Sequence, residues 1–339
     1  MATSRQDLSD IEFVRLCYDR LLKRPVDDEA ESNFKLGLEN GDLSREQLLI
    51  LLMTSEEYRL RTEALEFVPP GHFYSAVPSL ADRKAMISEG RASVEFLPGI
   101  ALNGASQFSL LKEFKAYYPE CSFPSKKTGS YRYYFDNPAY SYTDALTLYS
   151  MMCYFKPKRV IEIGSGFSSC AMLDTSDCVF DGQIKFTFIE PFPELLHSLL
   201  EKGDKKHTVL DQGVQDIDLK VFEQLEINDI LFVDSTHVSK LNSDVNKILF
   251  EILPTLKKGT LVHFHDIFWP FEYPNEWIAE GRAWNEAYIL RAFLQFNQDF
   301  EIIFFASYLH NFHKKWFAEN MPRYLNNLGG NIWLRKITD

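Results

Sequence analysis

Several features are scarce in this 339-residue sequence, and each scarcity excludes a class of protein. No run of about 18 apolar residues occurs, and the first residues contain no apolar segment typical of a signal peptide, so we expect neither a membrane span nor secretion. Cysteine is rare. Its five residues are odd in number and include no C-x-x-C pair, which predicts reduced, buried thiols in a cytoplasmic protein. They are Cys17, Cys121, Cys153, Cys170 and Cys178.

Positive charge is also in deficit. The 36 Lys and Arg residues stand against 48 Asp and Glu residues, which leaves a formal net charge of −12. Because an acidic chain repels phosphate backbones, and because no sizeable basic patch occurs along the sequence, we expect no nucleic-acid partner. Apolar residues at 45% and charged residues at 25% are ordinary globular values, which exclude disorder and collagen-like structure. Aromatic residues, at 14%, are the one excess.

The length predicts roughly two domains. Apolar residues at helical spacing predict that residues 1–66 form a small all-α module. Ser9 with Glu12, and Ser44 with Gln47, form capping boxes ahead of apolar runs, and each box predicts the start of a helix.

Part of this module matches a known pattern. The segment Phe13–Pro25, with Asp27 and later Ser55–Tyr58, resembles a small bacterial domain of unknown function that is similar to the phycobilisome-linker helical unit. Lys23 stands where that pattern usually has Gly. The resemblance implies an interaction module, so we expect residues 10–62 to bind a protein partner. A purely structural appendage is the alternative.

Composition changes after this module. The sequence Pro69-Pro70-Gly71 interrupts helix and sheet alike and marks a domain break. We expect residues 67–158 to be an aromatic-rich segment, with helices over 106–118 and 144–154 that pack on the domain that follows.

Residues 159–339 show short apolar runs that alternate with helix-length stretches. This pattern predicts an α/β domain with a mostly parallel sheet and helices on both faces. Ligands of such sheets bind beyond the carboxyl ends of the strands, so functional residues should follow each run. The candidate strands are Val160–Ile163, Lys185–Ile189, Thr208–Leu210, Asp229–Val233, Thr260–Phe264, Glu301–Phe305 and Asn331–Leu334.

The first run ends in a turn with two glycines, Glu162–Gly166. Glycines permit a tight turn and close approach of a ligand to the backbone. Ser169 occupies the place of the third glycine of the dinucleotide fingerprint, which disfavours an NAD-dependent oxidoreductase. The second run ends in Glu190, where an acid can accept hydrogen bonds from a ribose, and the third leads to Gln215 and Asp216.

Together these motifs resemble the class I S-adenosylmethionine-dependent methyltransferases, and stretches across residues 68–337 look like a bacterial branch of that family. The resemblance implies a Rossmann-like seven-stranded sheet with helices on both faces, and S-adenosyl-L-methionine as the cofactor. For Asp216 a helix N-cap is the alternative role. The residues implied to bind the cofactor are Glu162, Gly164, Ser165, Gly166, Glu190, Gln215 and Asp216.

The fourth and fifth runs end in titratable residues. Asp234 closes the fourth run with His237 three residues on, and His263, His265 and Asp266 close the fifth. Neighbouring parallel strands end side by side, and imidazole has a suitable pKa for a general base. We therefore predict that His237 deprotonates an acceptor hydroxyl, which Asp266 positions, and that Asp234 is a further catalytic residue. Alternation along the strand predicts that His263 and His265 face the same side. The alternative is that these side chains only tie loops together.

The same residues resemble the site of metal-dependent sugar O-methyltransferases, which use a strand-four Asp, a His three residues later and acids after strand five. The resemblance implies a divalent ion, Mg²⁺ or a softer metal, held by Asp234, His265 and Asp266. His265 departs from that pattern, because it stands where those enzymes have a second acid, and this departure leaves a softer ion, or no metal at all, as the alternatives to Mg²⁺.

Aromatic residues crowd the stretch after strand five, with seven among the 21 residues 268–288. Rings with a few polar groups suit a carbohydrate, although a lid packed on the core is the alternative. We expect O-methylation of a sugar or glycan precursor. An NAD-dependent oxidoreductase and a non-catalytic interaction protein are the alternatives. The residues predicted to contact the acceptor are His265, Trp269, Tyr273, Arg282 and Trp284.

Overall fold

The computed structural model describes residues 8–62, 67–89 and 94–339. The chain divides into two compact units, Met1–Arg83 and Lys84–Asp339, and each is described by itself. The domain boundary predicted at residue 66 lies outside the described residues. Within the described ranges, no helix is both long enough and apolar enough to cross a membrane.

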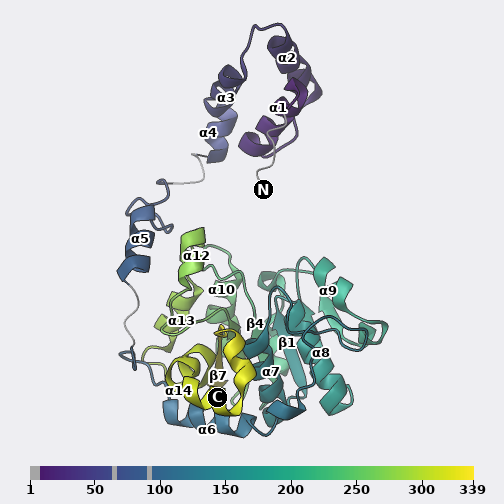
Figure 1. The fold of residues 1–339 in the computed structure, drawn as a ribbon, viewed down its shortest axis with the longest axis vertical. Helices are drawn as coiled ribbons and strands as arrows, with labels where there is room; N and C mark the ends of the chain where they lie inside the picture. Colours follow the sequence, from purple (N-terminus) through teal and green to yellow (C-terminus); the bar gives the residue numbers. More distant parts are fainter. Residues whose placement is uncertain (1–7, 63–66, 90–93) are drawn as a thin grey trace. The chain divides into compact units, whose positions relative to one another are not determined.

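The first unit is a set of short helices around a small core (Figure 1). Both predicted capping boxes are confirmed at the starts of α1 and α3. Lys23 adopts the left-handed conformation with φ of 49°, so a lysine takes the backbone shape that usually favours glycine. The buried core residues are Val14, Cys17, Tyr18, Leu22, Leu48 and Leu52. The elements are α1 (Asp10–Cys17), η1 (Tyr18–Leu22), α2 (Asp28–Glu39), α3 (Arg45–Met53) and α4 (Glu56–Thr62), and α5 (Leu80–Glu89) spans the division between the units.

The second unit is built on one seven-stranded sheet in the order β3-β2-β1-β4-β5-β7-β6. β7 runs antiparallel to both of its neighbours, and the pairs from β3 to β5 are parallel. The expected α/β fold with a mostly parallel sheet is confirmed, and each predicted strand lies within two residues of an observed one. The strands are β1 (Arg159–Ile163), β2 (Lys185–Ile189), β3 (Thr208–Leu210), β4 (Ile230–Val233), β5 (Leu261–His265), β6 (Phe300–Phe305) and β7 (Asn331–Lys336).

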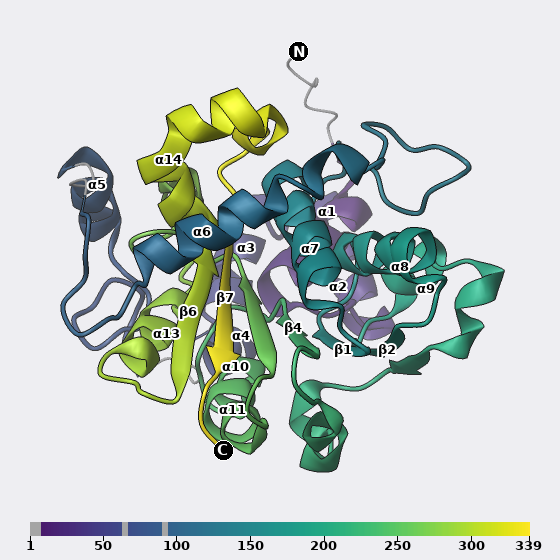
Figure 2. The ribbon, with the colours of Figure 1, turned by 90° about the horizontal axis from the view of Figure 1, so that it is seen from below.

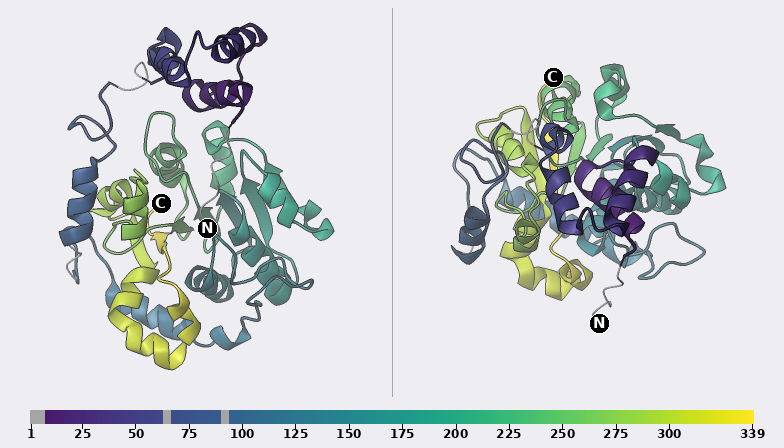
Figure 3. Two further views of the ribbon diagram at one scale, coloured as in Figure 1. Left: turned by 45° about the horizontal axis from the view of Figure 1, so that its top comes forward. Right: turned by 90° about the horizontal axis from the view of Figure 1, so that it is seen from above.

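Helices cover both faces of this sheet, and each face has its own hydrophobic core. Figure 2 shows the helices of the first layer over the strands, and in Figure 3 α14 lies beside α6, although the two are far apart in the sequence. The first layer contains α6 (Gly104–Phe114), α7 (Tyr142–Phe155), α8 (Phe167–Phe180) and α14 (Ala306–Asn320). The second contains η5 (Leu219–Gln224), α10 (Asp244–Lys247), η6 (Ile248–Ile252), α11 (Leu253–Thr255) and α13 (Glu286–Leu294). Connecting elements are η2 (Tyr118–Glu120), α9 (Glu194–Leu199), η3 (Lys202–Lys206), η4 (Val214–Asp216), α12 (Asn275–Glu280) and η7 (Pro322–Asn326).

The aromatic segment before the sheet is part of the core. The two helices predicted in it are confirmed as α6 and α7. Tyr133 and Phe135 are almost fully buried. Arg132 fastens this segment, because its guanidinium donates to Asp204 at 2.7 and 2.8 Å and to Asp174 at 2.7 Å. A buried cation with two carboxylates keeps its charge compensated.

All five cysteines are free, and four of them are buried as predicted. The prediction is wrong for Cys178, which is exposed. It lies in the last turn of α8, beyond the part of that helix which packs on the sheet.

Candidate active site

The turn after β1 depends on one of its two glycines. Gly164 has φ of 79°, and a Cβ atom there would overlap the carbonyl oxygen of Asp234. The turn is held to the sheet, because Gly164 N donates to the Ile189 carbonyl and Asp234 N to the Ile163 carbonyl. Gly166 has extended φ, and a Cβ atom there would make ordinary contact with Leu195. Close approach of the β1 and β4 strand ends therefore requires glycine at position 164.

Glu162 lies beneath this turn and is fully buried. Its carboxylate accepts hydrogen bonds from the hydroxyls of Ser168 and Ser169, at the start of α8. Burial raises the pKa of Glu162 to about 8, although these hydroxyls oppose the shift. The side chain thus ties β1 to α8, and it is not among the residues that line the cavity beyond the strand ends.

A cavity of about 480 Å³ opens beyond the carboxyl ends of β1, β2 and β4. Glu190 forms part of its wall, and both carboxylate oxygens are oriented by the backbone: Oε2 accepts from Ser165 N at 3.0 Å and Oε1 from Phe192 N at 2.9 Å. Gln215 also lines it and donates from Nε2 to the Asn242 carbonyl at 3.2 Å. The lining residues are Ile163, Gly164, Ile189, Glu190, Pro191, Phe192, Gly213, Val214, Gln215, Asp234, Ser235, Thr236 and Asp244.

Four predicted cofactor residues do not belong to that lining set, and buried Glu162 is the first of them. Ser165 and Gly166 lie in the adjacent turn, and Asp216 is exposed at the end of η4. The helix-cap role considered for Asp216 falls to Asp218, whose carboxylate accepts from Lys220 N at 2.9 Å.

His237 is the centre of a cluster of charged side chains beside this cavity. Its Nδ1 atom lies 2.8 Å from Glu286 Oε2, while Nε2 lies 3.5 Å from Asp234 Oδ1 and 3.4 Å from Asp266 Oδ2. The imidazole is buried at 5% exposure. Three carboxylates from three different segments therefore surround one ring.

The backbone of the cluster is unusual. His237 and Asp266 both have positive φ, 61° and 56°, which costs free energy in a residue with a side chain. The His237 carbonyl accepts from Asn285 N and Glu286 N, so it binds the free amides at the start of α13. Strained residues of this kind concentrate at functional sites.

Electrostatics in the cluster favour imidazolium. Burial lowers the pKa of His237, but hydrogen bonds and charge from Asp234, Glu286 and Asp266 outweigh it and raise the pKa to about 10. The Asp266 and Asp234 carboxylates likewise raise the pKa of His265 to about 10, against its burial. The two imidazoles hold the pKa of Asp234 well below its usual range, although desolvation opposes this shift. Burial raises the pKa of Asp266.

His265 joins the cluster from β5. Its Nδ1 atom lies 3.3 Å from Asp234 Oδ1 and 3.6 Å from Asp266 Oδ1. His263 stacks parallel to His265 with ring centroids 6.0 Å apart, so the prediction that both face the same side is confirmed. His263 is fully buried against Phe232 and does not reach the carboxylates.

The donor set fits a divalent cation. Ligand atoms of Asp234, His237 and Asp266 lie within 4.8 Å of one another, and one nitrogen with carboxylate oxygens is a common ligand set. Glu286 on the other imidazole nitrogen provides the outer carboxylate that usually orients a metal-binding His. The third ligand in this geometry is His237, whereas the sequence resemblance implied His265.

The predicted acceptor residues separate into two groups. Trp284 lies against the cluster, with its ring 4.4 Å from that of His237, and Arg282 lies over Trp284 and Trp277. Tyr273 contacts the Trp284 ring edge-on, and its buried hydroxyl accepts from Ala287 N. Trp269 packs instead against Phe305 and Tyr308, and its Nε1 atom donates to the Val94 carbonyl. Much of the aromatic stretch is therefore core.

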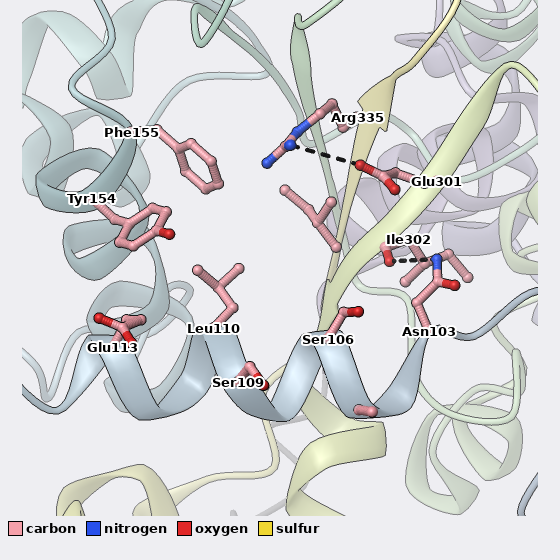
Figure 4. Close-up of a pocket in the computed structure, with 12 residues that line it drawn as sticks. Asn103, Ser106, Ser109, Leu110, Glu113, Tyr154, Phe155, Glu301, Ile302 and Arg335 are labelled. Atoms are coloured by element: carbon pink, nitrogen blue, oxygen red, sulfur yellow. Dashed lines mark hydrogen bonds and ion pairs between the residues drawn. The ribbon is translucent and has the colours of Figure 1, made fainter.

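Another cavity, of about 560 Å³, lies away from this cluster (Figure 4). α6 presents Ser106, Ser109 and Glu113 to it, and Arg335 pairs with Glu301 at 3.7 Å across its far wall. None of the residues predicted to be functional lines it.

Sequence reasoning assigned no role to Glu286 or Ser235. Ser235 Oγ donates to Glu286 Oε1 at 2.8 Å and accepts from His237 N at 3.0 Å, so the two residues orient the imidazole together. Glu286 lies within residues 68–337, the part of the chain whose sequence resembles the methyltransferase family, and that resemblance was the available signal.

Known proteins resemble both units. Residues 161–267 match a family described as a methyltransferase domain, and residues 1–61 match the domain of unknown function DUF4214. An uncharacterized protein of Archaeoglobus fulgidus is 34% identical over 174 residues, which cover 49% of this chain and 77% of that protein.

Among solved structures, an SAH-bound methyltransferase of Podospora anserina is 13% identical, with a TM-score of 0.37, and the match covers 80% of this chain and 98% of that one. A putative methyltransferase of Thermobifida fusca is 13% identical, with a TM-score of 0.38 and coverage of 80% and 99%. Since the sequence match covers more than two thirds of the archaeal protein, the chain belongs to the same family as that protein, and its residues 161–267 form a methyltransferase domain.

Proposed function

We propose that this protein is an S-adenosylmethionine-dependent methyltransferase that methylates a hydroxyl group of a sugar or glycan precursor. One observation carries the proposal: Asp234 both lines the 480 Å³ cavity and contacts His237 in the charged cluster. A cofactor in the cavity would thus lie next to groups that can bind and deprotonate an acceptor. The volume is within the range of roughly 300–1,000 Å³ found for small-molecule sites.

Three lining residues suit the parts of the cofactor. Glu190 holds its carboxylate in one orientation through two backbone amides, which prepares it to accept hydrogen bonds from a ribose diol. Gly164 removes the side chain that would stand between the strand ends and the ligand. Gln215 presents an amide to the part of the cavity bounded by Gly213 and Val214, where we place the adenine.

Methyl transfer requires the acceptor oxygen to attack the methyl carbon in line with the departing sulfur. The acceptor hydroxyl must also lose its proton, because a neutral alcohol is a weak nucleophile. Nε2 of His237 has a single lone pair, so it serves either as the general base or as a metal ligand. Its role as general base stays a prediction.

We favour the role of ligand, because two carboxylates face Nε2 of His237 while Glu286 holds Nδ1, which is the usual arrangement around a metal-binding His. Asp234, His237 and Asp266 would hold the ion. A bound divalent cation lowers the pKa of a hydroxyl that it coordinates.

The acceptor class rests on the aromatic wall beside the cluster. The Arg282 guanidinium lies over the rings of both Trp277 and Trp284, which contact each other edge-on. Sugars pack their C–H faces on aromatic rings, while charged side chains bind the sugar hydroxyls. Binding of a protein partner through residues 10–62, and a cytoplasmic location, stay predictions.

Isothermal titration calorimetry tests which cofactor the protein binds. We expect wild-type protein to bind S-adenosylhomocysteine and not NAD, and Glu190→Ala to weaken binding at least tenfold. Glu194→Ala, which removes an exposed carboxylate from the nearby helix α9, is the matched control and should bind normally. Binding of NAD in place of S-adenosylhomocysteine would favour an oxidoreductase. Binding without turnover on any hydroxylated acceptor would favour a non-catalytic interaction role.

A further inference from the structure

A cavity of about 540 Å³ lies at the opposite end of the sheet from the proposed cofactor site. Arg159, Lys185 and Thr208, which begin β1, β2 and β3, all line it. The cofactor cavity begins where β1 and β2 end. The two cavities are therefore separated by the length of the strands.

The floor of this cavity is a polar region on a sheet face that is otherwise apolar. Val160 and Phe186 point into the core of the first helix layer, so by alternation their neighbours Arg159 and Lys185 face the second layer. Arg159 pairs in register with Lys185, and Thr187 with Thr208. Strands covered by helices on both faces normally carry apolar residues at such positions.

Two cations thus lie side by side on adjacent strands. Like charges in this arrangement are destabilising unless something compensates them. Lys206, at the end of η3, adds a third cation to the lining.

Among the described residues, the printed hydrogen bonds of Arg159 and Lys206 go to neutral groups, and none of the three cations forms an ion pair within 4.0 Å. Arg159 Nη1 donates to Gln224 Oε1 at 3.1 Å, and Lys206 Nζ to the Gly182 carbonyl at 3.0 Å. No carboxylate is among the described lining residues. The cavity of Figure 4 differs, because Glu113 and Glu301 line it and Arg335 is paired. The chain has a net charge of −12, so a cavity lined by three cations and no carboxylate differs from the average charge of the protein.

We propose that this cavity is a second ligand site, which binds the phosphoryl group of a phosphate-bearing small molecule. A phosphomonoester has a charge of about −1.5 to −2 at neutral pH and three acceptor oxygens, which matches three cations and the hydroxyls of Thr187 and Thr208. Arg and Lys are the usual phosphate-binding side chains.

The remaining lining suits the uncharged part of such a ligand. Gln183 and Gln224 offer amides, and Val221 offers an apolar surface from η5. Burial and the neighbouring Lys206 lower the pKa of His207, so its imidazole is neutral and can donate or accept one hydrogen bond.

The test is calorimetric titration with pyrophosphate at a constant ionic strength of about 0.15 M. We expect saturable binding to wild-type protein and at least a tenfold loss of affinity in Lys185→Glu/Lys206→Glu. Both lysines are exposed, so the variant should fold, and an unchanged unfolding temperature will verify this. Lys126→Glu/Lys127→Glu has the same charge change at two exposed lysines elsewhere and should bind as wild type does.

An equal loss of pyrophosphate affinity in the two double variants would mean that only net charge matters, and it would overturn the proposal. The absence of saturable pyrophosphate binding to wild-type protein would also overturn it. Pyrophosphate affinity should not change with saturating S-adenosylhomocysteine, and competition between the two would place the anion in the cofactor cavity and refute a second site. Glucose 1-phosphate and AMP, titrated in parallel, distinguish a sugar phosphate from a nucleotide. The experiment is independent of methyl transfer, because failure to bind S-adenosylhomocysteine would leave the pyrophosphate result interpretable.

Discussion

Glu286→Gln is the substitution that tests most directly how the His237 imidazole is held. Glu286 is 1% exposed in the first turn of α13, and its two carboxylate oxygens have separate partners, His237 Nδ1 and Ser235 Oγ, each at 2.8 Å. Glutamine has the same length and can occupy the same space. The substitution therefore removes the negative charge while it preserves packing.

The expected magnitude follows from the hydrogen bond that loses its charge. A hydrogen bond to a charged group contributes about 1.5–3 kcal/mol, and one pKa unit corresponds to about 1.4 kcal/mol. Glu286 is one of three carboxylates that raise the pKa of His237 to about 10. We expect Glu286→Gln to lower that pKa by about one to two units, and to reduce turnover by about 10- to 100-fold, as for other residues that orient a ligating or catalytic His.

Imidazole nitrogen signals followed by NMR across a pH titration measure the effect. Glu276→Gln is the control, because it removes the same charge from an exposed position on α12. An unchanged His237 pKa in Glu286→Gln would refute the role assigned to this carboxylate. An equal shift in the control would reduce the effect to long-range charge.

The other predictions concern the β1 turn and the cluster. Gly164→Ala should lower the free energy of unfolding by about 3 kcal/mol, because the residue has positive φ and a Cβ atom would overlap the Asp234 carbonyl oxygen. It should also abolish binding of S-adenosylhomocysteine. Urea denaturation measures the loss of stability, and the control Gly203→Ala should lower the free energy of unfolding far less, since no atom lies near its Cβ position. Burial raises the pKa of Glu162 to about 8, above its unfolded value, so its contribution to stability is complete below about pH 4.5 and is lost as pH rises through 8, by at most about 1.4 kcal/mol per pH unit. Glu162→Gln should flatten this decline in urea denaturation at a series of pH values, and equal slopes in both proteins would contradict a raised pKa. EDTA should abolish turnover, and Mg²⁺ or Mn²⁺ should restore it. Full activity in EDTA would contradict metal ligation by His237 and favour its role as general base.

Most of the architecture was predictable from the sequence because it depends on local pattern. Strand positions follow from short apolar runs, and the starts of α1 and α3 follow from capping boxes formed by residues three apart. The proximity of the two charged strand ends was predictable, since parallel strands place their carboxyl ends side by side. The aromatic stretch was harder to interpret. Trp269 and Trp284 occur in the same run, yet one packs in the core and the other lies on His237.

The sequence alone determined the α/β fold, the strand positions and the convergence of Asp234, His237 and Asp266, because spacing along the chain encodes each of these. Only the tertiary structure decided which partner orients His237, since Glu286 arrives from 49 residues away through the packing of α13. Only the tertiary structure assembled a cationic cavity in an acidic chain. Arg159, Lys185 and Lys206 form no basic run in the sequence, and the parallel register of β1, β2 and β3 brings them together at one end of the sheet.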